Sequence, residues 1–482
     1  MGVMGRNITL SRYDGESSFS ELSTISESPL DAKVLWIGTD DGVVQLSRDG
    51  GVTWDDVTAR IPGVPSGTFV SRVHASALGR GAAYVSFDGH RGGDYAPYLF
   101  RTLDFGATWT RVSGNLPGDM PVRTVHEYDG KPGVVFAGME FGLYLSVDTA
   151  RTWTRVASLP TTRYDDILVH PRTKDVIVGT HGRSIWILDD ASPIAAWSGA
   201  IAAKRVHLFP VRPATLFQFW EDFSYRAQGA FAGENPKDGA LISYSLGSAA
   251  NAVTITIATP AGKVIRSLKG PASAGMVHRI NWDLRHAPPP ASGFGGDEEG
   301  GSAGALPRPP RDIDDRGPFV SPGTYVVTID ADGEKSTQSV VVKPDPLLPV
   351  SVAQQKVRES FLLEVSGAQS TVAEVGQRMT ALRKQLTDRR TGAAEGSGAR
   401  SGADSALTRL TALERTLRAG PGAVRGRVYG LAGEFNGQGA LQGSLHPPTK
   451  THREQFAIIK AILARVQLQL AELEAKVGAL QD

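Results

Sequence analysis

Residues with carboxylate, imidazole and guanidinium groups gather in short segments between residues 40 and 183, and each segment follows a hydrophobic run. Paired carboxylates can carry out the acid and base steps of glycoside hydrolysis, and arginine forks bind carboxylate groups of ligands. This set of side chains therefore favours binding or cleavage of a glycan or a peptide. The segments are TDDG with Asp40 and Asp41, FDGHRGGDY with Asp88, His90, Arg91, Asp94 and Tyr95, MEFG with Glu140, and THGR with His181 and Arg183, and nearby strand starts add Arg72, Arg123, Arg163, Tyr164, Asp165 and Asp166.

Two functional roles follow from these residue types. A glycosidase would take its two carboxyl groups, about 5 to 9.5 Å apart, from the candidates Asp40, Asp41, Asp88 and Glu140. A binding protein would use the basic and aromatic side chains instead. The candidates for ligand binding are His90, Arg91, His181, Arg183, Arg72, Arg163 and Tyr164.

Each segment also has a purely structural interpretation. Asp-Asp-Gly and Glu-Phe-Gly are ordinary hairpin turns, and His181 and Arg183 could bridge neighbouring sheets. The loop from Asp88 to Pro97 is longer than a tight turn requires, so His90 and Arg91 favour a binding role more than the other candidates do.

The composition excludes several other chemistries. The 482 residues include no cysteine, which removes disulfides, thiolate metal ligands and a cysteine nucleophile. Gly-x-Ser-x-Gly, P-loop and His-Glu-x-x-His motifs are absent from the sequence. We expect no cofactor and no metal site, although Asp88 and Asp94 could offer oxygen atoms to a divalent cation.

Charge and hydropathy restrict the partners. The formal net charge of +1 predicts no nucleic-acid partner. No stretch of 18 uninterrupted apolar residues occurs, so we expect no membrane insertion, and the first residues do not form a signal peptide.

A repeated motif supplies the framework that must position these side chains. Three nine-residue segments share the pattern Ser/Thr-x-Asp-x-Gly-x-Thr-Trp, and their aspartates are 55 and 44 residues apart, close to the length of one propeller blade. An aspartate that bonds to its own turn, a glycine with positive φ and a tryptophan packed between blades explain the pattern, so we predict a structural role. The motif residues are Ser47, Asp49, Gly51 and Trp54, then Thr102, Asp104, Gly106 and Trp109, then Ser146, Asp148 and Trp153, with Ala150 in place of the third glycine.

Short strands flank each motif and predict a mainly β protein with three parts. Residues 1–215 form a partial propeller of about four blades, the last taking its outer strand from 206–211, with Trp36 and Trp186 in blade cores. Six longer strands in 221–345 predict an Ig-like β-sandwich, interrupted by a Pro/Gly/acidic insertion at 287–318 that we expect to be disordered.

Residues 350–482 form an α-helical bundle or hairpin. Apolar residues from Phe456 to Leu480 alternate steps of three and four, and upstream runs from Phe361 to Leu386 and Leu407 to Leu417 offer matching faces. We therefore favour packing of this seam within the chain over dimerisation. Thr451 and Glu454 predict a capping box at the start of the last helix.

The three motifs resemble the Asp box, or bacterial neuraminidase repeat, of sialidases and sortilin-type propellers. With AAYVSFDGHR, EFGLYLSVD and VGTHGRSIWILDD, the chain is similar to bacterial sortilin-like proteins labelled glycosyl hydrolases, and it resembles their C-terminal half. The resemblance implies a secreted or periplasmic protein, with N-terminal blades missing from this sequence as partners. The sialidase Phe-Arg-Ile-Pro motif is absent.

The resemblance implies a binding module for peptide or glycan ligands. In such a blade the Asp boxes lie on one face, and the loops between the second and third strands lie on the opposite face with the candidate residues. The alternatives are a sialidase-like glycoside hydrolase that uses the carboxylates of that face, and a cell-envelope scaffold.

Overall fold

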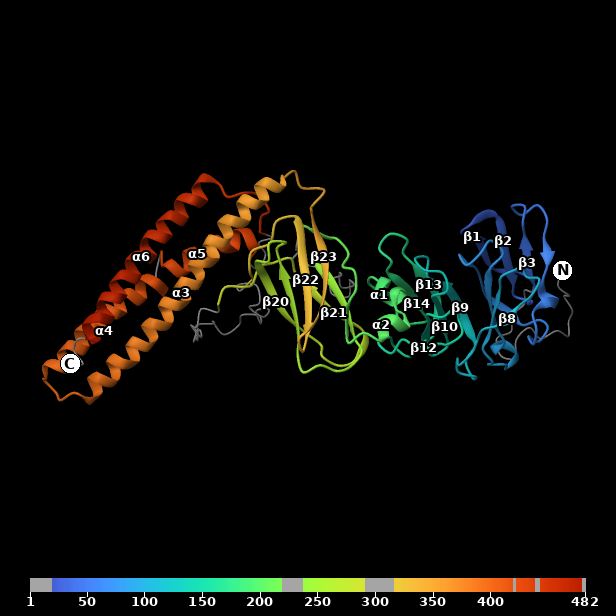
Figure 1. Ribbon diagram of the computed structural model, residues 1–482, viewed down its shortest axis with the longest axis horizontal. Helices are drawn as coiled ribbons and strands as arrows, with labels where there is room; N and C mark the ends of the chain where they lie inside the picture. Colours follow the sequence, from blue (N-terminus) through green and yellow to red (C-terminus); the bar gives the residue numbers. More distant parts are fainter. Residues whose placement is uncertain (1–19, 219–236, 291–315, 419–421, 438–442, 479–482) are drawn as a thin grey trace. The chain divides into compact units, whose positions relative to one another are not determined.

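The computed structural model describes residues 20–218, 237–290, 316–418, 422–437 and 443–478. It divides into two compact units, residues 1–204 and 205–482, each with hydrophobic cores of its own. Sheets form the first unit and the beginning of the second, and long helices follow them (Figure 1). The predicted mainly β class with a C-terminal helical region is confirmed.

Within the described part of the first unit, four antiparallel sheets follow one another along the chain, and each pairs consecutive strands. The last has three strands, because the chain after Leu188 enters the short helices α1 (Ser192–Ala196) and α2 (Gly199–Ala202). Sheet 1 contains β1 (Leu22–Ser28), β2 (Asp31–Thr39), β3 (Val44–Ser47) and β4 (Asp55–Asp56); sheet 2 contains β5 (Phe69–Ala75), β6 (Ala83–Asp88), β7 (Tyr98–Thr102) and β8 (Thr110–Arg111); sheet 3 contains β9 (Val122–Glu127), β10 (Val135–Met139), β11 (Gly142–Ser146) and β12 (Thr154–Arg155); sheet 4 contains β13 (Tyr164–Val169), β14 (Val176–Thr180) and β15 (Ile185–Leu188).

Each of these sheets packs face to face on the next. Hydrophobic clusters fill the space between sheets 1 and 2, around Trp36, between sheets 2 and 3, around Met139, and between sheets 3 and 4, around Phe136. The first strands β1, β5, β9 and β13 are successive neighbours. This radial stacking of antiparallel sheets is the arrangement of propeller blades.

A glycine in the second strand lets the first strand of the next sheet come close. A Cβ added to Gly38 would overlap Val70 of β5, and one added to Gly138 would lie 2.6 Å from the carbonyl oxygen of Tyr164 in β13. A hydrogen bond also joins sheets 1 and 2, since the hydroxyl of Ser23 donates to the Val70 carbonyl at 2.8 Å. The second strand of one sheet therefore lies close against the first strand of the next at both positions.

The repeated motif forms the turn between the third and fourth strands, with one hydrogen-bond network. Thr53 donates to Asp49 from its backbone N–H at 2.9 Å and from its hydroxyl at 2.6 Å, while Ser47 accepts from the N–H of Gly51 at 2.8 Å. The bonds from Thr53 lower the pKa of Asp49 to about 2. The carboxylate of the aspartate and the hydroxyls of the motif are thus bonded inside the turn, as expected of a structural role. The same bonds recur at Asp104 with Thr108, Thr102 and Gly106, and at Asp148 with Thr152, Ser146 and Ala150.

The motif tryptophans show which sheets have a neighbour. Trp109 meets Trp36 of the preceding sheet edge to face at 5.9 Å, and the indole N–H of Trp153 donates to the carbonyl of Val112, just after β8 of the preceding sheet, at 2.9 Å. Trp54 is 37% exposed, because no described sheet precedes sheet 1. The prediction that these rings pack between sheets therefore holds for two of the three.

The second unit begins with two sheets that share a hydrophobic core around Trp282. Val206 and Leu208 are buried in that core, so the predicted outer strand of the fourth blade pairs with β18 instead. The predicted insertion at 287–318 lies largely outside the described residues. One sheet contains β16 (Val206–Leu208), β18 (Ala240–Leu246) and β21 (Gly275–Trp282), and the other contains β17 (Ala214–Leu216), β23 (Glu334–Pro344), β22 (Gly323–Ala331), β19 (Val253–Ala258) and β20 (Val264–Gly270).

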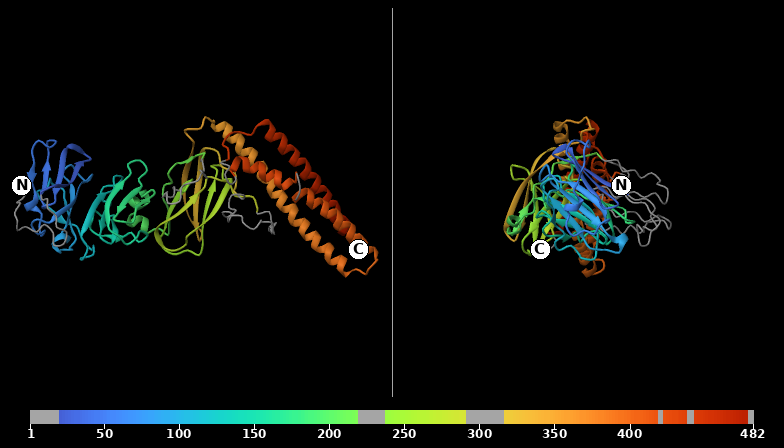
Figure 2. Two further views of the ribbon diagram at one scale, coloured as in Figure 1. Left: turned by 180° about the vertical axis from the view of Figure 1, so that it is seen from behind. Right: turned by 90° about the vertical axis from the view of Figure 1, so that its right-hand side faces the viewer.

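Four helices complete the described part of the second unit, and the long helices run side by side (Figure 1 and Figure 2). The predicted seam packs within the chain, since its residues from Phe456 to Val477 share one core with Phe361 to Leu386. The cap is Thr449 rather than Thr451, because the hydroxyl of Thr449 accepts from the N–H of His452. No described helix is long and apolar enough to cross a membrane. The helices are α3 (Val352–Gly392), α4 (Gly398–Arg418), α5 (Val424–Asn436) and α6 (Lys450–Gly478).

Two buried arginines, Arg285 after β21 and Arg358 in α3, bind carbonyl groups at and beyond the end of α5. Arg285 donates to the carbonyl of Asn436 at 3.3 Å, and Arg358 donates to the carbonyls of Phe435 at 3.0 Å and Ser444 at 2.6 Å. The carbonyls of Phe435 and Asn436 end α5 and have no partner in their own helix. Burial lowers the pKa of Arg285 to about 10 and that of Arg358 to about 9.

We predict that Gly138→Ala destabilises the first unit, because the added methyl group meets the carbonyl of Tyr164 and the side chain of Thr124. Overpacking of this kind costs about 1 to 3 kcal/mol. The matched control is Gly179→Ala, at the corresponding place in sheet 4, where only Asp166 of the same sheet lies within 4 Å. Urea unfolding of both variants measures the difference; equal stability of the two would contradict the proposed close approach.

Candidate functional site

The loops between second and third strands lie at the same end of sheets 1 to 4, away from the repeated motifs. They comprise residues 40–43, 89–97, 140–141 and 181–184. We call this end the loop face. It carries most of the candidate residues that the sequence singles out, and the first residues of the inner strands lie beside it because each inner strand pairs antiparallel with the second strand.

Arg123 connects the loops of sheets 2 and 3. Its guanidinium donates to Asp88 and, from Nη2 at 2.5 Å, to Glu140. The ring nitrogen Nδ1 of His90 lies 2.8 Å from the same Asp88 oxygen and 3.1 Å from Nη1 of Arg123. Asp88 is only 3% exposed, so it is a buried carboxylate held between two basic groups. The sequence had named Arg123 only as a strand-start residue, yet it is the centre of this cluster.

Arg72 crosses from sheet 2 to sheets 3 and 4. Its Nε donates to the hydroxyl of Thr124 at 3.0 Å, and its Nη2 donates to the carboxylate of Asp166 at 2.5 Å. The three residues belong to three successive inner strands. Arg72 therefore ties the inner strands together, and its guanidinium is already satisfied by protein groups.

Arg163, Asp165 and His181 form a third cluster at the loop face, within sheet 4. The Nε of Arg163 lies 2.8 Å from Asp165, and its Nη2 lies 2.9 Å from Nδ1 of His181. The imidazole of His181 is mostly exposed. Of the three clusters, this one is the most accessible to a ligand.

The acidic loop of sheet 1 is a self-contained turn. Asp40 accepts from the backbone N–H of Glu21 at 2.8 Å, and Asp41 accepts from the hydroxyls of Thr39 and Ser20. Burial raises the pKa of Asp41, but the hydrogen bonds from Thr39 and Ser20 outweigh it, so the net shift is downward. A carboxyl group held ionised in this way is unsuited to act as a general acid.

Two other predicted residues are also used internally. Tyr164 is fully buried, and its hydroxyl donates to the carbonyl of Pro160 at 2.7 Å, so its side chain is not offered to a ligand. Asp94 accepts from the backbone of Ala96 and from the hydroxyl of Tyr98 at 2.7 Å, which braces the long loop of sheet 2.

Exposed aromatic side chains accompany the charged groups on this face. Tyr95 and Phe141 are each 50% exposed in the loops of sheets 2 and 3. Trp186, predicted to lie in a blade core, is 41% exposed, and its indole N–H donates to the carbonyl of Arg183. The guanidinium of Arg91 lies over the ring of Phe69. The face thus presents aromatic rings next to fixed polar groups.

Sequence inspection missed a buried polar cluster between sheets 2 and 3. Glu127 accepts from the hydroxyl of Ser76 and the N–H of Ala77, and burial raises its pKa. His74 and His126 pack ring against ring at 4.5 Å, and burial lowers the pKa of both. No motif marks these residues, because only the pairing of sheets brings them together.

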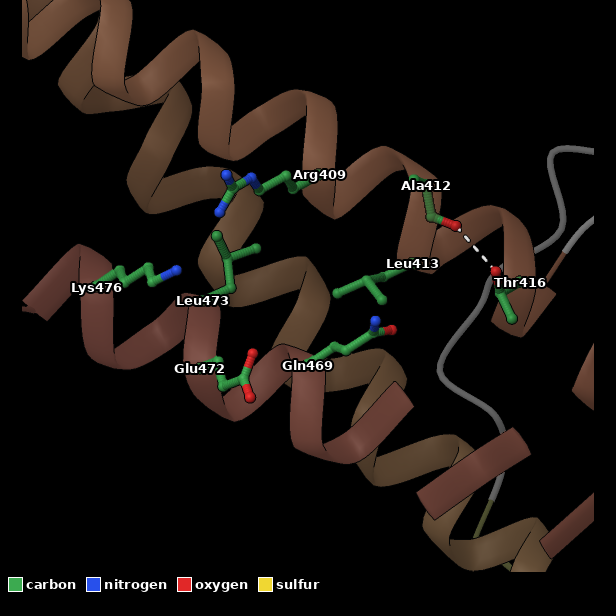
Figure 3. Close-up of a pocket in the computed structure, with 8 residues that line it drawn as sticks. All are labelled: Arg409, Ala412, Leu413, Thr416, Gln469, Glu472, Leu473 and Lys476. Carbon is green, nitrogen blue, oxygen red and sulfur yellow. Dashed lines mark hydrogen bonds between the residues drawn. The ribbon is translucent and has the colours of Figure 1, made fainter. Parts of the chain in front are cut away.

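The described residues form no metal site, and one groove among them lies outside the first unit. Among the described residues, no group of three or more histidine and acidic side chains could hold a metal ion. An open groove of about 380 Å³ lies in the other unit, between α4 and α6 (Figure 3), with Arg409 and Lys476 near Leu473. It mixes both charges with apolar residues and shares no residue with the clusters above.

The first unit is thus a propeller-like series of sheets with a polar and aromatic loop face. No family model matches the chain. Over 227 residues it is 27% identical to a xyloglucanase from Paenibacillus sp., in a match that covers 41% of this chain and 21% of that protein, so the chain spans about a fifth of this relative.

Solved structures give weaker likenesses. YCF48 from Cyanidioschyzon merolae is 15% identical, with 47% of this chain and 66% of that chain covered and a TM-score of 0.26. A structure of YCF48 bound to D1 peptide is 12% identical, with 52% and 69% covered and a TM-score of 0.27. Overlays at these scores do not establish a shared architecture.

We predict that Arg123→Ala destabilises the first unit by about 3 to 5 kcal/mol, because it leaves the buried carboxylate of Asp88 without its cation. Arg183→Ala is the control, since that side chain is exposed and its loss should change stability by no more than about 0.5 kcal/mol. Urea unfolding followed by circular dichroism compares the two. A neutral Arg123→Ala would show that the pair is not a structural element.

We predict that the first unit loses stability as the pH falls below about 6.5. The folded-state pKa of His74 and His126 is lowered, so the unfolded chain binds protons first and stability is lost as the pH decreases. Glu127, whose pKa is raised, acts in the opposite direction. The expected slope is at most about 1.4 kcal/mol per pH unit for each proton.

His74→Gln tests the source of this slope, because glutamine can still accept from the N–H of Glu127 but cannot be protonated. Urea midpoints at pH 7.5, 6.5 and 5.5 should fall less steeply in the variant than in the unaltered chain. If both fall equally, the histidine pair is not responsible.

Proposed function

We propose that the first unit is a binding module for a glycan or peptide, and that the ligand lies on the loop face. The observation that carries this proposal is the set of half-exposed aromatic side chains, Tyr95, Phe141 and Trp186, next to the accessible His181 and Arg183. Ligand sites combine aromatic surface with a few fixed polar groups. Here the ion pairs of Arg123 and Arg163 hold the loops in place before a ligand arrives.

A glycan is the ligand that we favour. Sugar rings present both apolar C–H faces and hydroxyl groups, which suit exposed rings beside histidine and arginine donors. The likeness to a xyloglucanase supports a plant-type polysaccharide as the first ligand to test. The exposed charged groups would also accept a peptide, which is why peptide binding remains part of the proposal.

The proposal also includes the family to which the first unit belongs. The hydrogen-bond network of the repeated motif supports its assignment as an Asp box, and hence a sortilin-like propeller. In this proposal the protein acts outside the cytoplasm, the sheets of the second unit are an Ig-like sandwich, and that unit serves as spacer and assembly element.

A glycoside hydrolase is the second candidate, and one observation favours it. Asp88 and Glu140 bind the same guanidinium, which brings two carboxyl groups to within about 10 Å of each other, the range of a glycosidase pair. However, Asp88 is buried and both carboxylates are engaged by Arg123. Binding without hydrolysis is therefore the function that we favour.

We predict that the chain binds soluble xyloglucan, and that Phe141→Ala and Tyr95→Ala each weaken binding about tenfold, the effect of losing about 1.4 kcal/mol of contact. Leu103→Ala is the matched control, because Leu103 is 57% exposed in a repeated-motif turn at the opposite end of its sheet. Isothermal titration calorimetry measures the affinities.

Assays of reducing-end release from the same polysaccharide separate the two candidates. Binding without product supports the binding module. Product formation that disappears in Glu140→Gln would support the hydrolase, whereas equal affinity of the Phe141→Ala, Tyr95→Ala and Leu103→Ala variants would remove the loop face as the site.

A further inference from the structure

Two of the three junctions between the described sheets of the first unit repeat one contact. Val70 and Tyr164 are the early residues of β5 and β13, and both are completely buried against the preceding sheet. The second-strand glycine of that sheet, Gly38 or Gly138, leaves room for each of them. Each of these two junctions therefore combines a buried residue at the start of an inner strand with a glycine in the sheet before it, whereas Ser86 takes the place of the glycine at the junction between sheets 2 and 3.

Sheet 4, the last described sheet of the first unit, has the glycine of this contact, but no inner strand of a following sheet packs on it. Strand pairing places Gly179 opposite Asp166 as it places Gly138 opposite Thr124. Yet a Cβ on Gly179 would meet only Asp166 of its own sheet, at 3.8 Å. Ile185 and Ile187 flank it and are 67% and 59% exposed. In sheet 3 the corresponding residues of the third strand, which are Leu143 and Leu145, are buried against sheet 4.

Sheet 1, the first described sheet, has the other side of this contact: an apolar residue at the start of its inner strand that packs on no preceding sheet. Leu22 pairs with Thr39 as Val122 pairs with Met139 and Tyr164 with Thr180, but Leu22 is 65% exposed whereas Val122 is fully buried. Trp54 also lacks the preceding sheet that covers the other two motif tryptophans. The described part of the first unit thus has the two surfaces of one more junction, the outer faces of sheets 1 and 4, and both are exposed.

We propose that the outer face of sheet 4 binds the outer face of sheet 1 of a second copy of this chain. Leu22 of one copy would lie over Gly179 of the other, and Trp54 would be covered as Trp109 is. The two surfaces do not meet within one chain, because both are exposed. Apolar faces of this kind on a single molecule mark interaction surfaces.

A second copy is the occupant that fits because the contact continues an existing series. A head-to-tail contact between identical copies forms a closed ring when its rotation closes. Two copies with four sheets each would give eight sheets, within the range of about four to eight blades that propellers use. Both junctions of such a ring would be identical, and each would repeat the packing already seen between sheets 3 and 4.

Engineered cysteines test the contact directly, since the sequence contains no cysteine. A Leu22→Cys chain mixed with a Gly179→Cys chain should form a mixed disulfide dimer under mild oxidation. Val264→Cys mixed with Gly179→Cys is the control, because Val264 is a strand residue of the second unit with a comparable exposure of 58%. The expected yield from the control mixture is near zero.

Light scattering of the full chain gives an independent measurement, with twice the chain mass expected at micromolar concentration. Gly179→Leu should fold normally, because its side chain enters free space, yet weaken association about 100-fold. Val264→Lys should not change the mass, whereas Ile187→Lys should give the single-chain mass.

Three results would overturn the proposal. One is a single-chain mass at all concentrations together with no mixed disulfide. In that case the two faces would bind sheets of a different polypeptide. Another is an intrachain disulfide in a chain that carries both cysteines. The third is a ladder of higher masses, which would replace the closed ring by an open series.

Discussion

The close approach of successive inner strands is the contact on which the first unit depends. At Gly38 and Gly138 the next sheet comes so near that even a methyl group would not fit. This approach brings the apolar faces together into continuous clusters between sheets. It also brings polar groups of different sheets into reach, so Arg72 can bond to sheets 3 and 4 and His74 can stack on His126. Packing and polar chemistry therefore share one geometric cause.

The stacking of the sheets also positions the side chains of the loop face. Arg123 begins an inner strand, and from there its guanidinium reaches carboxylates of two neighbouring sheets. Such pairs fix loops that would otherwise be free, which favours a preformed binding surface over one that a ligand must order. The same pairs occupy the carboxylates that a hydrolase would need. The opposite end is held by the repeated motifs, whose aspartates are used within their own turns. Hydrogen-bonded turns therefore lie at one end of the sheets, and the loops with charged and aromatic side chains lie at the other.

Periodicity and repeats in the sequence predict much of the architecture. The motif spacing predicted the succession of small sheets, and the three-and-four spacing from Phe456 predicted a helix that packs within the chain. The sequence did not predict the boundary between the two units, because Val206 and Leu208 suit either an outer blade strand or a strand of the next sheet pair. Trp186 was misjudged because β15 is the edge strand of a three-stranded sheet, where no fourth strand lies beside the ring. The candidate site was recovered as a set of loops, but Tyr164 proved to be buried and Arg123 central.

By itself, the sequence determined what depends on neighbours along the chain. The motif turns, the strand and helix periods and the loops that carry charged residues are local, because their hydrogen bonds and apolar faces recur within a few residues. Only the tertiary structure decided which charged groups neutralise one another, which aromatic rings stay exposed, and which sheets lack a partner. Arg123 and Asp88 lie 35 residues apart in sequence, and Arg72 and Asp166 lie 94 residues apart. Whether such residues meet depends on the stacking of whole sheets, which no local pattern encodes.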